Sequence, residues 1–208
     1  MKPAHAATHA QRSSSWGRRA RRAGVALAIA AAAVGAAWAE PVTYVIEPSH
    51  TFAHWEVLHF GTSTIRGRFG GIEGSVQLDR AARTGQISIT LDIATLDTGV
   101  APFNAKLRSN EFFDVAQYPK AWFVGRRLEF DGDRLKSVTG ELTLHGVSQG
   151  ITLTATHFNC YDHPYFKREV CGGDFEATLR RGEFGMPFGA PLVADRVRLL
   201  IQVEGVRQ

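Results

Sequence analysis

The sequence predicts an all-β protein, an antiparallel barrel of about eight strands with one short helix. Apolar and polar residues alternate over several segments, most regularly over 86–93 and 197–204. This period of two is typical of antiparallel strands with one buried and one solvated face. Turn-forming residues separate these segments at short intervals, as in a barrel or, alternatively, a two-sheet sandwich. Periodicity alone does not separate the two architectures.

The first 39 residues have the features of a secretory signal peptide. They contain six basic residues and no acidic one, then an apolar, Ala-rich run over 25–36 and the motif Ala37-Trp38-Ala39. The apolar run is shorter than the roughly 20 residues of a membrane span. A basic start, an apolar centre and an A-x-A motif predict export and cleavage before Glu40. We therefore expect one domain over 40–208, with an uncleaved N-terminal anchor as the alternative.

Removing this segment changes the charge of the protein. The whole chain has 24 basic and 20 acidic residues and a net charge of +4. Without the six basic residues of the signal, 18 basic and 20 acidic residues remain, a net charge of −2. The remaining chain therefore offers no basic stripe of the kind that binds nucleic acid, and we expect no nucleic-acid partner.

The expected strands follow one another with a turn signal between neighbours. Gly125 breaks the alternation within its strand, which predicts a β-bulge there. The turn signals are 79–85, Asp131-Gly132-Asp133 and His145-Gly146. In chain order the strands are one that ends at Leu78, 86–93, 122–130, one that starts at Leu135 and continues through 141–144, 151–158, 175–180 and 197–204.

Two segments lack the strand pattern. Segment 101–114 has a proline near its start and places Phe103 and Leu107 at helical spacing, so we expect a short helix there. Segment 159–173 is expected to be a long loop.

The chain has two cysteines, Cys160 and Cys171. In an exported protein, a lone pair this close in sequence predicts one disulfide, with two free thiols as the alternative. A zinc site is not expected, because no second Cys or His pair lies at zinc-ligand spacing.

Five motifs cover most of the chain after the signal. They are YVIEPSHTF (44–52), TIRGRF (64–69), LRSNEFFDVAQYP (107–119), VTGELTLHGV (138–147) and EFGM (183–186). Each is weak alone, but all five in this order resemble the YceI-like family. The resemblance implies a lipocalin-like barrel in the periplasm that holds a polyisoprenoid or a similar long amphiphile. This chain has Asn104 and Lys106 where many family members carry an acidic residue and a histidine.

Aromatic residues are abundant: 19 of the 21 Phe, Tyr and Trp residues lie after residue 39. A tunnel for an apolar chain needs apolar walls, because an unpaired polar group against hydrocarbon is costly. The pattern alone also fits a filled core; the resemblance favours a ligand tunnel. Strand face or helix position selects nine expected wall residues: Trp55, Leu91, Leu107, Phe113, Trp122, Leu142, Leu144, Phe175 and Leu179.

Other polar residues suggest chemistry less strongly. Ser49-His50 and the pair His54 and Glu56 invite a metal or catalytic interpretation, but no third ligand is evident. His145 lies at a turn without a recognisable nucleophile or oxyanion arrangement, so we expect it to bond the turn backbone. We therefore expect no catalytic residue, no metal and no cofactor apart from a bound lipid.

The function expected from the resemblance is a periplasmic carrier. One alternative is an accessory module that delivers a quinone-type ligand to a membrane redox partner, and a less favoured one is an enzyme built on the barrel. Fold analogy supports the carrier but does not establish a function. The sequence leaves the oligomeric state open, a dimer being one option.

Overall fold

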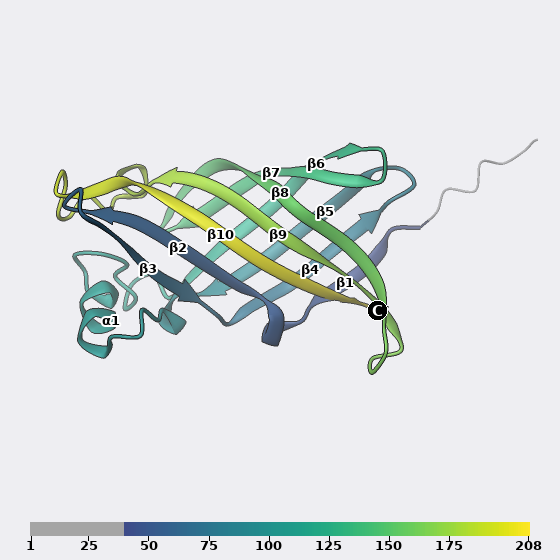
Figure 1. Ribbon diagram of the computed structural model, residues 1–208, viewed down its shortest axis with the longest axis horizontal. Coiled ribbons are helices and arrows are strands. Elements are labelled where there is room, and N and C mark those ends of the chain that lie inside the picture. Colours follow the sequence, from purple (N-terminus) through teal and green to yellow (C-terminus); the bar gives the residue numbers. More distant parts are fainter. Residues whose placement is uncertain (1–39) are drawn as a thin grey trace, which may run out of the picture. The chain divides into compact units, whose positions relative to one another are not determined.

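The computed structural model describes residues 40–208, which form an antiparallel barrel (Figure 1). The predicted signal peptide and its cleavage site lie outside the described residues, apart from Glu40. The strand order is β1-β4-β5-β6-β7-β8-β9-β10-β2-β3, and β1 also pairs with β10, which closes the ring. The strands are β1 (Val42–Ile46), β2 (Phe52–His59), β3 (Ser63–Phe69), β4 (Ile72–Asp79), β5 (Thr84–Asp92), β6 (Lys120–Asp131), β7 (Arg134–Leu144), β8 (Val147–His163), β9 (Arg168–Arg180) and β10 (Val193–Arg207).

Four of the ten strands combine into two interrupted strands. One consists of β1 and β2, and the other of β3 and β4. Both β1 and β2 are antiparallel to β10; β1 pairs with its end at Gly205–Arg207 and β2 with Val193–Gln202. Likewise β1 pairs with β4 and β2 with β3. The ring therefore has eight hydrogen-bonded positions, and the predicted barrel of about eight strands is confirmed.

Local chemistry explains both interruptions. Pro48 has no N–H for a strand ladder and begins the short 3₁₀ helix η1 (Pro48–His50) between β1 and β2. The hydroxyl of buried Thr51 donates to Glu47 O (2.7 Å) and accepts from Glu204 N (3.1 Å), which replaces lost backbone bonds. Between β3 and β4, Gly71 has a φ of +57°, a conformation that favours glycine.

The predicted bulge and hairpins are also present. The register of β6 against β7 shifts between Gly125 and Arg127, which is the bulge that the broken alternation predicts. The turn between β6 and β7 contains Gly132-Asp133, and the turn between β7 and β8 is His145-Gly146.

The expected helix is in the right place but was predicted too long. Helix α1 (Ala101–Arg108) ends where Ser109 bonds Lys106 O through both its N–H and its hydroxyl. Segment 109–114 forms turns instead, so the prediction of a helix to residue 114 is wrong. Within residues 40–208, no helix is both long and apolar enough to cross a membrane.

The prediction of a long loop over 159–173 is wrong. Strand β8 continues to His163 and β9 begins at Arg168, so the connection is a four-residue turn. The hairpin reaches beyond the register that β9 shares with β10, which ends at Val170. Both faces near its tip are largely exposed, and this is why the segment lacks the alternation that marks a half-buried strand.

The disulfide between Cys160 and Cys171 is present and joins directly opposite residues of β8 and β9. Replacing both cysteines with serine should lower the free energy of unfolding by about 3 kcal/mol, the chain-entropy value for a loop of this length. The barrel should still fold, because the β8–β9 ladder continues on both sides of the bridge. Urea denaturation of both proteins measures the difference.

The control is thiol alkylation of the unmodified protein followed by intact-mass measurement. No alkylation should occur before reduction, and both cysteines should react after it. An unchanged denaturation midpoint in the double serine variant would contradict the prediction.

Candidate ligand-binding cavities

Two cavities lie inside the barrel. The first has a volume of about 220 Å³ and the second about 350 Å³. Among the described residues, none with a charged side chain borders the first cavity, and Tyr44 and Thr51 carry the only hydroxyl groups there. Four residues border both cavities and form what we call the waist: Phe69, Leu144, Leu179 and Leu199.

Each of the nine expected wall residues borders a cavity. Leu91, Trp122, Leu142 and Phe175 border the first, Trp55, Leu107 and Phe113 the second, and Leu144 and Leu179 both. The structure thus brings together positions that are up to 124 residues apart in the sequence. Their contact with a ligand stays a prediction.

Trp122 differs from the others in orientation. Its side chain is 46% exposed, and it lies opposite Thr90 and Thr143 on the outer face of the sheet. The next residue, Phe123, alternates to the inner face and packs in the core. Sequence patterning selected Trp122 in this strand and did not select Phe123, the adjacent aromatic residue whose side chain points inward; both border the first cavity.

The second cavity lies under the segment that contains α1. Phe113 meets Phe69 edge-to-face with ring centroids 5.4 Å apart, and Phe112 meets Phe188 at 5.2 Å. Figure 1 shows α1 beside β3, at the end of the barrel where β10 begins. At this end β3 pairs only with β2, so no further strand covers the second cavity beyond it. The segment that contains α1 forms this part of the cavity wall instead.

Exposed apolar side chains border the second cavity at this end. Phe60, in the β2–β3 turn, is 54% exposed, and Leu192, in the loop before β10, is 55% exposed. Phe60 N–H donates to Leu192 O at 2.7 Å, which ties the two loops together. We call Phe60, Phe188 and Leu192 the mouth. Sequence patterning missed the mouth, because turn residues follow neither strand nor helix period.

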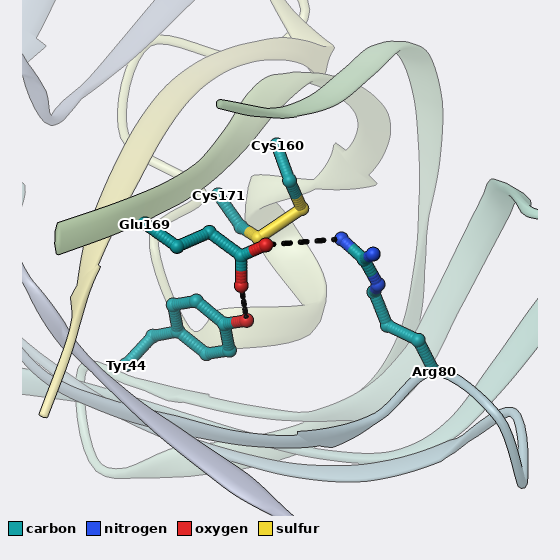
Figure 2. Close-up of a disulfide and its surroundings, with 5 residues drawn as sticks. All are labelled: Tyr44, Arg80, Cys160, Glu169 and Cys171. Carbon is teal, nitrogen blue, oxygen red and sulfur yellow. Dashed lines mark hydrogen bonds and ion pairs between the residues drawn. A yellow bond between two sulfur atoms is a disulfide. The ribbon is translucent and has the colours of Figure 1, made fainter. Parts of the chain in front are cut away.

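The opposite end of the barrel is closed. Buried Tyr44, Leu78 and Cys171 form a cluster there that also borders the first cavity. Beyond it, the Tyr44 hydroxyl donates to Glu169, and Arg80 Nη1 lies 3.5 Å from the other carboxylate oxygen. Figure 2 shows Glu169 between Tyr44 and Arg80, beside the disulfide. These contacts fasten the β8–β9 hairpin to β1 and to the residue that follows β4.

Among residues 40–208, Arg181 is the only Lys, Arg, Asp or Glu that borders the second cavity, and His59 borders it as well. Arg181 is 7% exposed and donates to the backbone oxygens of Ala194 (3.0 Å), Met186 (2.6 Å), Phe188 (2.7 Å) and Val193 (2.8 Å). It thereby holds the loop that carries part of the mouth. Burial lowers the pKa of Arg181, and Coulombic attraction to Asp195 opposes this. An arginine nevertheless stays protonated in proteins.

Sequence reasoning missed Arg181, although a signal was available. The inward residues Phe175, Ala177 and Leu179 define the buried face of β9, and the same parity continues to residue 181. A charged residue on the inward parity of a strand is unusual and marks a position worth attention.

The Ser49-His50 motif is a cap and has no catalytic geometry. Ser49 Oγ donates to Glu47 Oε1 at 2.6 Å, so its proton does not point to the imidazole. His50 Nδ1 lies 2.6 Å from Glu47 Oε2, and both backbone N–H groups of Ser49 and His50 also donate to Glu47. Burial raises the pKa of Glu47, but these hydrogen bonds outweigh it and lower the pKa to about 2.

His54 and Glu56 do not form a metal site. Glu56 pairs with Arg66 (2.7 Å) and Arg198 (3.4 Å) on the outer surface, and the hydrogen bond from Arg66 lowers its pKa. Within residues 40–208, no three His, Cys, Asp or Glu side chains lie close enough together to hold a metal ion.

His145 has a structural contact. Its Nδ1 lies 3.0 Å from Phe184 O, and since a carbonyl only accepts, Nδ1 is the donor. Its ring packs on Tyr118 at 4.5 Å. The imidazole therefore connects the β7–β8 turn to the 3₁₀ helix η3 (Arg181–Phe184).

Asn104 and Lys106 of α1 also have structural partners. Asn104 Oδ1 accepts from Thr98 N (2.8 Å) and Thr98 Oγ1 (2.6 Å), which fixes the loop before the helix. Lys106 pairs with Glu111 and lies over the ring of Phe188 at 5.0 Å.

Comparison with known proteins gives one consistent result. The model of the YceI-like domain matches residues 44–205. A UPF0312 protein of Pseudomonas putida is 35% identical over 186 residues, 88% of this chain and 96% of the relative. A UPF0312 protein of Pseudomonas aeruginosa is 32% identical over 186 residues, again 88% of this chain and 96% of the relative.

Two solved structures share the fold. Burkholderia cenocepacia BcnA superposes with a TM-score of 0.63 at 21% identity, covering 76% of this chain and 98% of its own. A polyisoprenoid binding domain from Saccharophagus degradans superposes with a TM-score of 0.59 at 14% identity, covering 79% and 98%.

Tyr44, in the cluster at the disulfide end, should lose its phenol proton only at high pH. Burial, followed by the hydrogen bond to Glu169 and its negative charge, raises the pKa of Tyr44 from 10.0 to about 12. Because the folded state favours the neutral phenol, this contribution to stability is complete below pH 10 and is lost as the pH rises from about 10 to about 12. Ultraviolet titration of tyrosinate should show this late phenol, and Glu169→Gln should lower its pKa.

Tyr165→Phe is the matched control, because Tyr165 is 87% exposed. It should remove one phenol from the titration and leave the late step unchanged. Loss of the late step in Tyr165→Phe, or its persistence in Tyr44→Phe, would contradict the assignment.

Proposed function

The chain belongs to the YceI-like family, and from that premise we propose that it is a binding protein that carries one long apolar ligand inside its barrel. The ligand class is a polyisoprenoid or another long-chain amphiphile. The observation that carries the proposal is the pair of apolar cavities that share the four waist residues, with the Tyr44 cluster at one end and the mouth at the other.

Physical chemistry supports a chain-like ligand. Each methylene group moved from water into an apolar site contributes about 0.8 kcal/mol. A ligand that reaches from the mouth past the waist into the first cavity would bury many such groups, which offsets the free-energy cost of association. A compact polar metabolite would instead leave hydrogen-bonding groups unpaired against leucine and phenylalanine side chains.

The direction of entry follows from the two ends. The hairpin contacts of Glu169 and the Tyr44 cluster oppose passage at the disulfide end. The mouth is made of turn and loop residues with exposed apolar side chains, and such segments move more readily than paired strands. We therefore propose that the hydrocarbon tail enters first through the mouth and comes to lie in the first cavity.

Binding without chemical conversion fits the polar groups near the cavities. Arg181 serves loop carbonyls, and the Ser49-His50-Glu47 group is an exposed cap. The predicted signal peptide and the disulfide support a periplasmic location. A quinone with an isoprenoid tail belongs to the same ligand class; delivery to a membrane redox partner stays a prediction, as does the oligomeric state.

The direct test is lipid analysis of the protein as purified from its native host. Native mass spectrometry should show one added mass per chain, and organic extraction should release one long-chain lipid. If repeated extraction yields no lipid, and isoprenoids of several lengths leave the melting temperature unchanged, the proposal is wrong.

A variant at the waist should change chain-length preference. Leu144→Trp places a larger side chain where the cavities meet, so chains long enough to cross the waist should bind about tenfold more weakly, while shorter chains keep their affinity. Thr143→Trp is the control, because Thr143 lies on the outer face of the same strand and bonds Ser148. Isoprenoid alcohols of increasing length, titrated against both variants, measure the difference; equal length profiles would contradict a role for the waist.

A further inference from the structure

The mouth is apolar and lies in uncharged loops. Its three side chains are about half exposed: Phe60 54%, Phe188 45% and Leu192 55%. They belong to two connections that a backbone hydrogen bond ties together, 59–63 (HFGTS) and 187–192 (PFGAPL), and neither contains Lys, Arg, Asp or Glu. Large apolar side chains gathered in this way form a patch, and exposed apolar patches mark interaction sites on soluble proteins.

The connections at the disulfide end have a different composition. They are 79–84 (DRAART), 131–134 (DGDR) and 162–168 (DHPYFKR), and each carries charged residues of both signs. The last one also exposes Tyr165 and Phe166, but charged residues flank them on both sides. Figure 1 shows these turns at the end of the barrel away from α1. The barrel therefore has one charged end and one apolar end.

The apolar surface of the mouth continues into the second cavity. Phe60, Phe188 and Leu192 all border that cavity, so the same side chains meet both solvent and the cavity. A long-chain lipid reaches a carrier either through water or directly from a bilayer. Each methylene group lowers the concentration of the lipid in water about fourfold, which makes the aqueous route very slow for a long chain. Contact between the mouth and a bilayer would let the chain pass from one apolar surrounding to another.

Two arginines lie just behind the mouth. Arg180, the last residue of β9, is directly opposite Arg196 of β10, and both side chains are exposed. Like charges directly opposite each other on neighbouring strands destabilise a sheet. Asp195 lies 3.7 Å from Arg180, but segment 180–196 still has three basic and two acidic residues. An anionic group from outside the chain would therefore be attracted to this surface and would relieve the repulsion.

We infer that the mouth is the surface by which this protein docks on a lipid bilayer that contains anionic phospholipid. Phe60, Phe188 and Leu192 enter the boundary between head groups and acyl chains, where interfacial proteins place such side chains. Arg180 and Arg196 meet the lipid phosphates, which guanidinium groups bind well. This inference rests on the proposed function and adds to it the place where the ligand is exchanged.

The test is flotation of the protein, as purified from its native host, with vesicles of phosphatidylethanolamine and phosphatidylglycerol and with vesicles of phosphatidylcholine alone. Phe60→Asn combined with Leu192→Ser removes two exposed apolar side chains and should weaken binding to both kinds of vesicle at least about tenfold. Asparagine is chosen because residue 60 has a φ of 51°, which asparagine tolerates. The matched control, Tyr165→Ser combined with Phe166→Ser, removes two exposed aromatic side chains at the charged end and should leave binding unchanged.

Arg196→Gln separates the electrostatic contribution. It should weaken binding to the vesicles with phosphatidylglycerol about fivefold, the share of one arginine near an anionic surface, and leave binding to phosphatidylcholine unchanged. Its melting temperature should not fall, because the substitution removes a like-charge pair. Arg134→Gln is the control, since Arg134 is exposed at the other end of the barrel, and it should bind as the unmodified protein does.

A second readout keeps the mouth apolar. In Phe60→Trp, vesicles should shift the emission of the added indole to shorter wavelength, and lipids brominated on their acyl chains should quench it. In Tyr165→Trp the same vesicles should do neither. Both variants are compared with the unmodified protein, whose own Trp55 and Trp122 give the background signal.

Three outcomes would overturn this inference: no flotation with either kind of vesicle, equal binding by the mouth variant and the unmodified protein, or quenching that is the same for Phe60→Trp and Tyr165→Trp. If the mouth variant instead turns a dimer into a monomer in sedimentation analysis while neither protein floats, the occupant of the mouth is a second copy of this chain and the inference is wrong. Isoprenoids added from cyclodextrin test the proposed function separately. Isoprenoid binding without flotation overturns only the docking, and flotation without isoprenoid binding contradicts only the carrier function.

Discussion

An eight-position ring of strands encloses more volume than its own inward side chains fill, and the rest of the structure depends on this constraint. A ring of this size can either pack its interior or hold one ligand. Here the inner faces carry mostly leucine, isoleucine and phenylalanine, yet two cavities remain. The disulfide-linked hairpin and the α1 segment are both additions to the ring, one closing an end and the other completing the wall beside β3.

The same constraint makes every polar atom inside the barrel informative. An apolar interior raises the free-energy cost of an unpaired donor, so most polar side chains there have partners: Thr51 replaces backbone bonds, and Arg181 collects four carbonyl oxygens. Trp55 stands apart, because its Nε1 lacks a partner and Gly67 keeps the ring in place. The unpaired indole nitrogen is therefore held against the backbone of β3.

Sequence patterning predicted the parts of this protein that repeat. Alternation over 86–93 and 197–204 located strands whose inner residues border the cavities, and the break at Gly125 located a bulge. The segments that it missed or misjudged show no regular alternation of apolar and polar residues. The mouth residues lie in turns and loops, and the tip of the β8–β9 hairpin is exposed to solvent on both faces. Trp122 and Phe123 are adjacent aromatic residues, so the sequence alone does not show which of them points into the barrel. The register with the neighbouring strand decides it, because Phe123 lies opposite Ile89 and Trp122 opposite Thr90.

The closing pair of strands has a consequence for how the protein reaches this state. Tyr44 of β1 pairs with Arg207 of β10, so the ring joins residues from opposite ends of the sequence. Contacts between such distant residues require a large loss of chain entropy before they contribute stability, and proteins dominated by them fold slowly. A chain that emerges N-terminus first must therefore hold β1 unclosed, with its apolar face uncovered, until β10 has followed, an interval in which it is exposed to aggregation.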